Sequence, residues 1–355
     1  MRTQISFLSY DNKITKEKEE FNIYKAIFKL LFFYGFIIIY QFSIEINTVK
    51  KLLYFEPILN KSPPKNRFIE ADNIKVALCT MGKRENLYAK EFIEYYVNLG
   101  VDQLFLFDDN DPNTERISDI VEDKYKPYVT IYENIKDTIK NQSIAFTTCY
   151  HNNIDKFDWF IMIDMDEFLY IVNDTLKDYL ASRRFDECDF LKFHWVVSTD
   201  NNLVHYDSRP LFERFKPPYI KDKFVKTLVR GNIPDLKYWV HSPNYSPFRN
   251  NTCNNLGEKI NYDYINIESV LPINVDKAFL IHFRFKSTEE FITKFKRGYS
   301  DWFGDRLDWF LNENLGDYFG QNNITIEKID YVERELNVRL FKYRLKYYLS
   351  HMFYL

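Results

Sequence analysis

Residues 158–170 read DWFIMIDMDEFLY, an apolar run that meets three carboxylates and then becomes apolar again. The apolar part has the length and composition of a buried strand. The carboxylates are Asp164, Asp166 and Glu167. Acids at the end of a buried strand are costly unless positive charge lies beside them. Because ligands in open α/β sheets bind beyond the carboxyl ends of the strands, this stretch predicts a ligand site at a sheet edge.

The segments that precede this stretch alternate between strand-like and helix-like patterns. Alternation at this spacing predicts βα units, and therefore an α/β fold with a mostly parallel, doubly wound sheet flanked by helices. The second predicted strand also runs into acids, at Asp108 and Asp109, so both acid clusters should lie at one edge. Strands are expected at 74–81, 102–111, 128–133 and 157–171, and helices at 86–100, 116–125 and 141–154.

The second half of the chain has fewer clear signals. The spacing of Ser287 and Glu290 is typical of a capping box at the start of a helix over 287–299. The tail over 326–348 has a helical pattern, so a helical C-terminal segment is expected at 301–355. Further strands are expected at 190–197, 224–230 and 278–285.

The N-terminal part predicts a membrane anchor. Residues 26–43 contain an apolar run about as short as a bilayer-spanning helix can be, and lysines precede it. We therefore expect a cytoplasmic tail at 1–25, a signal anchor at 26–43, a linker at 44–72 and a catalytic domain at 73–300. That arrangement is a single-pass type II membrane protein of the Golgi or endoplasmic reticulum. The alternative is a buried N-terminal helix that packs on the domain.

Composition excludes some classes of function. The 355 residues include 48 basic and 51 acidic side chains, so no basic surplus indicates nucleic-acid binding. The four cysteines form no CxxC pair, which argues against a zinc site. Cys79 and Cys149 fit buried apolar positions, whereas Cys188 and Cys253 could pair in a lumenal protein. Six N-x-S/T sequons agree with a lumenal location: Asn60, Asn141, Asn173, Asn244, Asn250 and Asn323.

The pair Asp164 and Asp166 predicts a metal-bound, phosphorylated ligand. Two carboxylates this close in a dry site need a compensating cation. Mg²⁺ typically takes one or two carboxylates together with substrate phosphates. The alternative is a solvated turn, since acids often follow strands.

Three segments together carry a family resemblance: KVALCTMGKRENLYAKEFIEYYVNLGVDQLFLFDDND, DWFIMIDMDEFLY and IHFRFKSTEEFITKFKRG. They resemble glycosyltransferases with a GT-A fold, and most closely the family 92-like and family 2-like group. The likeness covers about residues 74–298. It implies a Rossmann-like nucleotide-sugar-binding domain that moves a hexose from a nucleotide-sugar to a glycan acceptor with Mn²⁺ or Mg²⁺, and a UDP-sugar is the expected donor.

The resemblance also implies roles for individual residues. Asp164 and Asp166 would bind the metal and the diphosphate, and His282 would be a third metal ligand or a diphosphate contact. Asp108, with Asp109 beside it, would lie near the nucleotide. The leaving diphosphate would be neutralised by the basic positions Lys286, Lys294 and Arg297.

An inverting transfer needs a general base for the acceptor hydroxyl. Asp200 is preferred because it follows a strand in a polar turn, with Asp207 and Glu213 as alternatives. Glu167 is a weaker candidate, because its position beside the metal pair also suits a residue that holds the surrounding groups in place. His194 and Trp195 lie where an acceptor sugar could stack.

Two other functions stay open. An aspartate-nucleophile phosphatase also carries D-x-D after an apolar strand, and its first Asp attacks phosphate. It prefers the motif on its first strand, whereas three predicted strands precede it here. The other is a glycan-binding relative that has lost turnover. The sequence does not indicate an oligomeric state.

Overall fold

The computed structural model of this protein describes residues 68–135, 139, 141–245, 251–260, 273–297, 307 and 310–351. The chain divides into two compact units, residues 1–62 and 63–355, and all described residues belong to the second. The predicted tail and anchor, and the linker as far as residue 67, lie outside the described residues. In the part that is described, no helix is long and apolar enough to cross a membrane.

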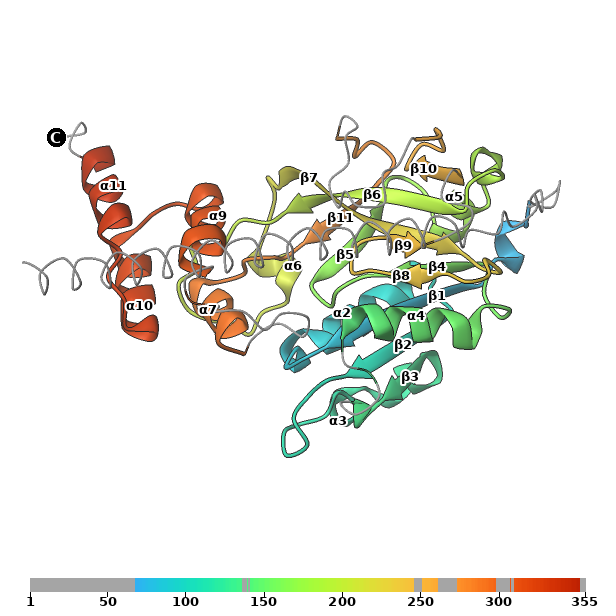
Figure 1. Cartoon of the computed structure of the whole chain (residues 1–355), viewed down its shortest axis with the longest axis horizontal. Coiled ribbons are helices and arrows are strands. Elements are labelled where there is room, and N and C mark those ends of the chain that lie inside the picture. The colour runs from blue at the N-terminus through green and yellow to red at the C-terminus, as the bar shows by residue number, and fades with distance from the viewer. Residues whose placement is uncertain are drawn as a thin grey trace, which may run out of the picture. The chain divides into compact units, whose positions relative to one another are not determined.

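The second unit is a mixed α/β structure built around one curled sheet of nine strands (Figure 1). The strand order is β3-β2-β1-β4-β7-β6-β11-β5, and β10 pairs with β6. The strands are β1 (Val76–Gly82), β2 (Gln103–Asp108), β3 (Val129–Tyr132), β4 (Trp159–Met162), β5 (Glu167–Ile171), β6 (Phe190–Val197), β7 (Ile220–Arg230), β10 (Thr252–Asn254) and β11 (Ala278–His282). A separate hairpin pairs β8 (Lys237–Tyr238) with β9 (Pro243–Tyr245).

The helices follow the predicted βα order in the first half. They are α2 (Asn86–Leu99), α3 (Ile117–Ile120), α4 (Gln142–Asn153), α5 (Leu176–Leu180), α6 (Leu211–Arg214), α7 (Thr288–Arg297), α9 (Leu315–Gln321), α10 (Ile326–Leu336) and α11 (Phe341–His351). Short 3-10 helices lie at Ala71–Asn73, Asp123–Tyr128 and Arg183–Phe185, and a π-helical turn lies at Phe310–Asn314.

Pairing is parallel among β3, β2, β1 and β4, as the alternation predicted. Antiparallel neighbours enter where β7 pairs with β4 and β6, and where β5 pairs with β11. The sheet is thus parallel on one side and mixed on the other. Parallel strands end in the same direction, so β2, β1 and β4 bring their carboxyl ends to one edge.

Two apolar cores cover the two faces of this sheet. Alternate residues of β1 point to opposite faces, so Leu78 joins the core under α2 while Cys79 joins the core under α4. Figure 1 shows α2 and α4 along the parallel strands. The α2 helix ends at Gly100, whose φ of 103° is a left-handed C-cap that glycine adopts at little cost.

The predicted strand over 157–171 is wrong in one respect, because it is broken at the acids. β4 ends at Met162, and β5 begins at Glu167 on the far side of the sheet, where it pairs with β11. The break is held by a hydrogen bond of 2.9 Å from the Asp164 amide to Glu167 Oε2. The carboxylates therefore lie in a turn between two strands instead of along one.

Two expected helices are also shorter than predicted. The segment over 116–125 forms only α3 before a 3-10 helix follows. The tail divides into α10 and α11, because Asn337 adopts a left-handed conformation with φ of 52°. The capping box before α7 is confirmed: the Ser287 amide donates to Glu290 Oε2 at 3.0 Å, and the Glu290 amide donates to Ser287 Oγ at 3.2 Å.

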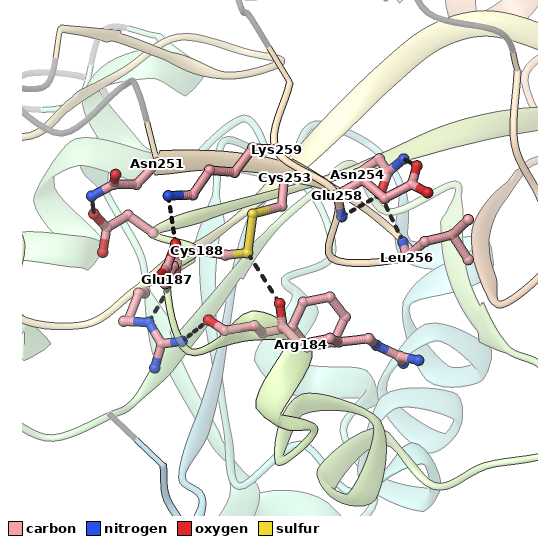
Figure 2. Close-up of a disulfide and its surroundings, with 12 residues drawn as sticks. Arg184, Glu187, Cys188, Asn251, Cys253, Asn254, Leu256, Glu258 and Lys259 are labelled. Atoms are coloured by element: carbon pink, nitrogen blue, oxygen red, sulfur yellow. Dashed lines mark hydrogen bonds and ion pairs between the residues drawn. A yellow bond between two sulfur atoms is a disulfide. The ribbon is translucent and has the colours of Figure 1, made fainter. Parts of the chain in front are cut away.

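All four cysteines form disulfides. Cys79 in β1 bonds to Cys149 in α4, so the prediction that these two are only buried apolar residues is wrong. Cys188 bonds to Cys253, as the lumenal reading allowed. Figure 2 shows this second bond joining the loop before β6 to strand β10.

Candidate functional site

Asp166 is the most heavily compensated acid at the sheet edge. Its Oδ2 lies 3.1 Å from Lys286 Nζ and 2.6 Å from Lys294 Nζ, and its Oδ1 lies 3.5 Å from His282 Nε2. The side chain is only 2% exposed. Burial by itself would raise the pKa of Asp166, but Lys286, Lys294 and His282 together hold the pKa well below its usual range. Asp166 is therefore an ionised carboxylate at the centre of a cationic cluster.

Asp164 turns toward a different cation. Its Oδ2 lies 3.1 Å from Lys226 Nζ, and its Oδ1 accepts a hydrogen bond from Gln142 at the start of α4. Its side chain is 34% exposed, so it is the more open of the two aspartates. Burial raises the pKa of Asp164, but Lys226, the hydrogen bond from Gln142 and His282 together lower it, and the net shift is downward.

Glu167 lies beneath this pair and is fully buried. Its Oε2 accepts from the Asp164 amide and lies 3.5 Å from Lys226 Nζ. Burial raises the pKa of Glu167 well above its usual value, which Lys226 only partly opposes. A buried carboxyl in this position shapes the turn that carries Asp164, in keeping with the supporting role that the sequence allowed it.

Lys226 is a site residue that sequence reasoning missed. It lies on β7, is fully buried, and also donates to the Val240 carbonyl at 2.7 Å. Burial would lower the pKa of Lys226, but Asp164 and Glu167 raise it, so the ammonium form is retained. A lysine in the middle of the strand-like segment FVKTLVR was the available signal, because a buried lysine needs a carboxylate partner.

His282 is the last residue of β11 and lies in the same cluster, next to Asp166. Its ring lies 4.4 Å from the ring of Trp195, which in turn lies 5.2 Å from the ring of His241. Burial lowers the pKa of both histidines, that of His241 to about 3, so both rings are neutral at neutral pH. No sequence signal pointed to His241. Trp195 is 6% exposed, so a sugar could stack on it only after the ring is uncovered.

A cavity of about 330 Å³ opens beside Asp166. Lys286 and Lys294 form its inner wall, and the Lys286 ammonium lies 4.4 Å from the centre of the Tyr88 ring. Arg297 also lines it, and its guanidinium binds the Lys83 carbonyl and the Glu85 carboxylate. The cavity wall thus carries three of the predicted phosphate-binding cations.

The loops after β1 and β2 form the neighbouring part of the edge. Asp108 is 1% exposed, and its two oxygens accept from the amides of Asn110 and Ile117, each at 2.9 Å. Asp109 is also buried, and its amide donates to the Gly82 carbonyl at 2.8 Å. Asn110 accepts from the Arg84 amide at 2.5 Å. Asp108 thus holds the loop after β2 in place through two backbone amides.

Asp200 is not brought to this cluster. Its Oδ2 accepts from Tyr318 Oη at 2.6 Å and lies 2.6 Å from Lys328 Nζ, and its Oδ1 accepts from the Asn202 amide at 2.8 Å. Neither Asp200 nor these partners line the cavity beside Asp166. The contacts join the turn after β6 to α9 and α10, and Asp200 is 1% exposed.

The alternative bases lie at the surface or near it. Asp207 forms an ion pair with Arg209, with Oδ2 and Nη2 2.5 Å apart. Glu213 lies in α6 and is exposed. His194 is 4% exposed, and its Nδ1 accepts from the Asn274 amide at 3.5 Å.

The donor set of Asp164, Asp166 and His282 has the chemistry that Mn²⁺ or Mg²⁺ requires, but its arrangement is not that of a metal centre. Within the described ranges, no group of three or more His, Cys, Asp or Glu side chains is placed to hold a metal ion. Lys226 contacts Oδ2 of Asp164, and Lys286 and Lys294 contact Oδ2 of Asp166, while Oδ1 of Asp166 faces His282. A metal at these aspartates would therefore compete with lysines for Oδ2 of each residue.

Comparison with known proteins identifies the family to which the chain belongs. The sequence model of glycosyltransferase family 92 matches residues 72–316, which is more than half of the chain. This chain belongs to glycosyltransferase family 92. The matched range begins before β1, ends in α9, and contains the acidic turn and every cation of the cluster.

Two curated proteins similar to this chain come from plants. A glycosyltransferase family 92 protein of Ricinus communis is 21% identical over 257 residues, which are 68% of this chain and 40% of the relative. A glycosyltransferase family 92 protein of Oryza sativa subsp. japonica is 28% identical over 138 residues, 38% of this chain and 22% of the relative. The matches thus span less than half of the length of these relatives.

Proposed function

We propose that the protein transfers a hexose from a nucleotide-sugar, UDP-linked, to a glycan acceptor. One observation carries the proposal. The acidic turn Asp164–Glu167 lies at the carboxyl ends of parallel strands, and the cations around Asp166 line a cavity beside it. This is the place where open α/β sheets bind their ligands. Family membership supplies the reaction class.

The chain's own cations would bind the diphosphate of the donor. Lys286 and Lys294 face the cavity while they contact Asp166, so incoming phosphate oxygens can share their ammonium protons. Arg297 would add a further cation at the same wall. As the bond from the sugar to the diphosphate breaks, negative charge grows on the leaving oxygen, and fixed cations stabilise it without reorganisation.

Mn²⁺ or Mg²⁺ is part of the proposal, with Asp164, Asp166 and His282 as the residues that would hold it. When bound, such an ion would neutralise charge on the leaving diphosphate. Lys226 contacts Asp164, and Lys286 and Lys294 contact Asp166. An ion bound to these carboxylates would therefore compete with the three lysines. Metal dependence is accordingly one arm of the test below.

We propose inversion at the sugar carbon, which requires a base for the acceptor hydroxyl. Asp200 was the preferred residue from the sequence. Its engagement by Tyr318 and Lys328 supports a structural role for it instead. The proposal therefore assigns the role of base to no residue.

The two disulfides support a lumenal location. Disulfides persist in oxidising compartments and are rare in the cytosol. Both described bonds lie within the α/β unit. With residues 26–43 as the anchor, the protein would be a type II membrane protein of the Golgi or endoplasmic reticulum.

The test is donor turnover by the full-length protein in detergent. A panel of UDP- and GDP-sugars is assayed for nucleoside diphosphate release with Mn²⁺, with Mg²⁺ and with EDTA. The matched variants are Asp166→Asn and Asp155→Asn, the second being an exposed acid at the end of α4. Release of one nucleotide that Asp166→Asn abolishes and Asp155→Asn retains is the expected result.

Each other outcome selects a different function. Nucleotide binding without turnover on any acceptor would favour the glycan-binding relative. Phosphate release from simple phosphoesters, with no binding of nucleotides, would favour the aspartate-nucleophile phosphatase. Turnover that is equal with Mn²⁺ and with EDTA would retain the transferase and remove the metal from the proposal.

A further inference from the structure

Helix α11 exposes an apolar stripe. Phe341, Leu345, Tyr348 and Leu349 are 76%, 60%, 54% and 48% exposed. Their spacing of i, i+4, i+7 and i+8 places them on one face of a helix. Single exposed apolar residues are common, but four on one face of an 11-residue helix form a continuous surface.

The opposite face of α11 is already packed. Tyr343 is 8% exposed, and its ring lies 4.6 Å from that of Phe319 in α9. Arg344 binds Glu333 at 2.6 Å and Asp330 at 2.5 Å, which fixes α11 against α10. Figure 1 shows α11 beside α10 at the C-terminal end of the α/β unit. The helix is therefore held in place with its apolar stripe turned outward.

Cations border the stripe. Lys342 and Lys346 are exposed and follow Phe341 and Leu345 directly, so they lie along one side of it. Arg344 lies on the other side, at the junction with α10. The sequence from Phe341 to His351 contains no acid. An apolar stripe with aromatic residues, bordered by lysines, is the pattern of helices that lie in the interface of a membrane.

We propose that α11 docks on a membrane surface that contains anionic lipid. The stripe would enter the boundary between headgroups and acyl chains, and Lys342 and Lys346 would contact the lipid phosphates. The helix would lie parallel to the membrane plane, because it is about 16 Å long and only one face of it is apolar. This surface is separate from the cavity beside Asp166 and does not depend on the proposed reaction.

The charge pattern favours a bilayer over a second copy of the chain. Two α11 stripes in contact would bring Lys342 and Lys346 of both copies together, with no acid in either helix to compensate. A stable interface also needs about 800 Å² from each partner, which four side chains on three turns do not supply. A lipid surface requires neither shape complementarity nor a matching patch.

A label on the stripe tests the proposal in the full-length protein. All four native cysteines are in disulfides, so Leu345→Cys gives one reactive thiol for an environment-sensitive fluorophore. The labelled protein is reconstituted in phosphatidylcholine vesicles with and without phosphatidylserine. We expect a blue shift of the emission and quenching by spin-labelled lipids, both stronger with phosphatidylserine.

Asp155→Cys is the matched control, since it places the same label on an exposed site in α4–β4. Both labelled proteins carry the apolar segment 26–43, so attachment to the vesicles through that segment is common to both. Lys342→Glu with Lys346→Glu should abolish the response to phosphatidylserine without changing the unfolding temperature, because both side chains are exposed.

Two results would overturn the proposal. One is equal emission and equal quenching at positions 345 and 155 in all vesicles. The other is efficient crosslinking between Leu345→Cys thiols of two copies in neutral detergent, which would assign the stripe to self-association.

Discussion

The ammonium group of Lys294 lies 2.6 Å from Oδ2 of Asp166, although 128 positions separate the two residues in the chain. Lys286 binds the same oxygen from the start of the same helical segment. One carboxylate thus gathers the cations that face the cavity. This contact ties the acidic turn after β4 to α7.

Asp166→Asn should impair both function and stability. The change leaves Lys286 buried without its carboxylate, and loss of one partner of a buried ion pair costs about 3–5 kcal/mol. Removing a group that positions the charge-stabilising cations should lower turnover by roughly 100-fold or more. Urea unfolding and nucleotide release measure the two effects. Full turnover by a folded Asp166→Asn protein would refute the central place of this residue.

Lys294→Gln separates the contribution of the Asp166 cluster to donor binding from its contribution to stability. Lys294 is 22% exposed, so its removal should cost less stability than removal of Asp166. Loss of one charged contact to a phosphate should weaken donor binding by about 1.5–3 kcal/mol, which raises the KM. Kinetics with varied donor concentration measure this change. Lys296→Gln is the control, because Lys296 pairs with Glu335 at the surface; an equal effect of both changes would contradict the prediction.

Local patterns predicted the parallel half of the sheet well. The strands β1, β2 and β3 and the helices α2 and α4 each carry an apolar pattern bounded by turn residues, so each can be read without its neighbours. The broken strand could not be read this way. Apolar and aromatic residues flank the acids on both sides, so the sequence pattern is that of one continuous strand. The hydrogen bond from the Asp164 amide to Glu167, which closes the turn between the two strands, is visible only in the structure.

The candidate site residues also divide into those that local sequence reveals and those that only the fold brings together. Asp164 and Asp166 were found because they follow a recognisable strand. Lys226 lies on β7 and His241 in the loop after β8. The lysine inside the strand-like segment FVKTLVR indicates a carboxylate partner without saying which one, and no local signal connects His241 to the acids. Asp200 illustrates the reverse case. Its polar turn suggested an open site, but Tyr318 and Lys328, more than 100 positions later, cover it.

Asp200→Asn should act mainly on stability. Lys328 is fully buried and would lose its carboxylate, at a cost of about 3–5 kcal/mol in the free energy of unfolding. Lys328→Met added to Asp200→Asn should restore part of that loss, because it removes the uncompensated charge. Denaturant unfolding of the two variants measures this. If Asp200 were a catalytic base, Asp200→Asn would lose turnover and keep its stability, and adding Lys328→Met would not restore turnover.

Each disulfide should stabilise the fold by about 2–5 kcal/mol, since both close loops of similar length, 70 and 65 residues. Cys79→Ala with Cys149→Ala should also lower turnover, because it loosens α4, whose Gln142 binds Asp164. Cys188→Ala with Cys253→Ala should affect stability alone. Thermal unfolding and turnover at low temperature measure both. Equal turnover of the two double variants would refute the link from the Cys79 disulfide to the site.

Glu333 should make stability depend on pH in the acid range. It binds Arg344 and the Leu340 amide, each at 2.6 Å, and these contacts lower the pKa of Glu333 to about 2 in the folded protein. In the unfolded chain a glutamate has a pKa of about 4.3. A lowered folded pKa gives stability that is complete above the unfolded value and is lost as pH falls toward the folded one.

Glu333→Gln should therefore be less stable than the parent at pH 7, and the difference should shrink between about pH 5 and pH 2. Unfolding free energies across that range measure the effect. Glu327→Gln, at an exposed position of the same helix, is the control and should leave the curve nearly parallel to that of the parent. A constant difference between Glu333→Gln and the parent at every pH would show that packing, and not ionisation, accounts for the contribution of Glu333.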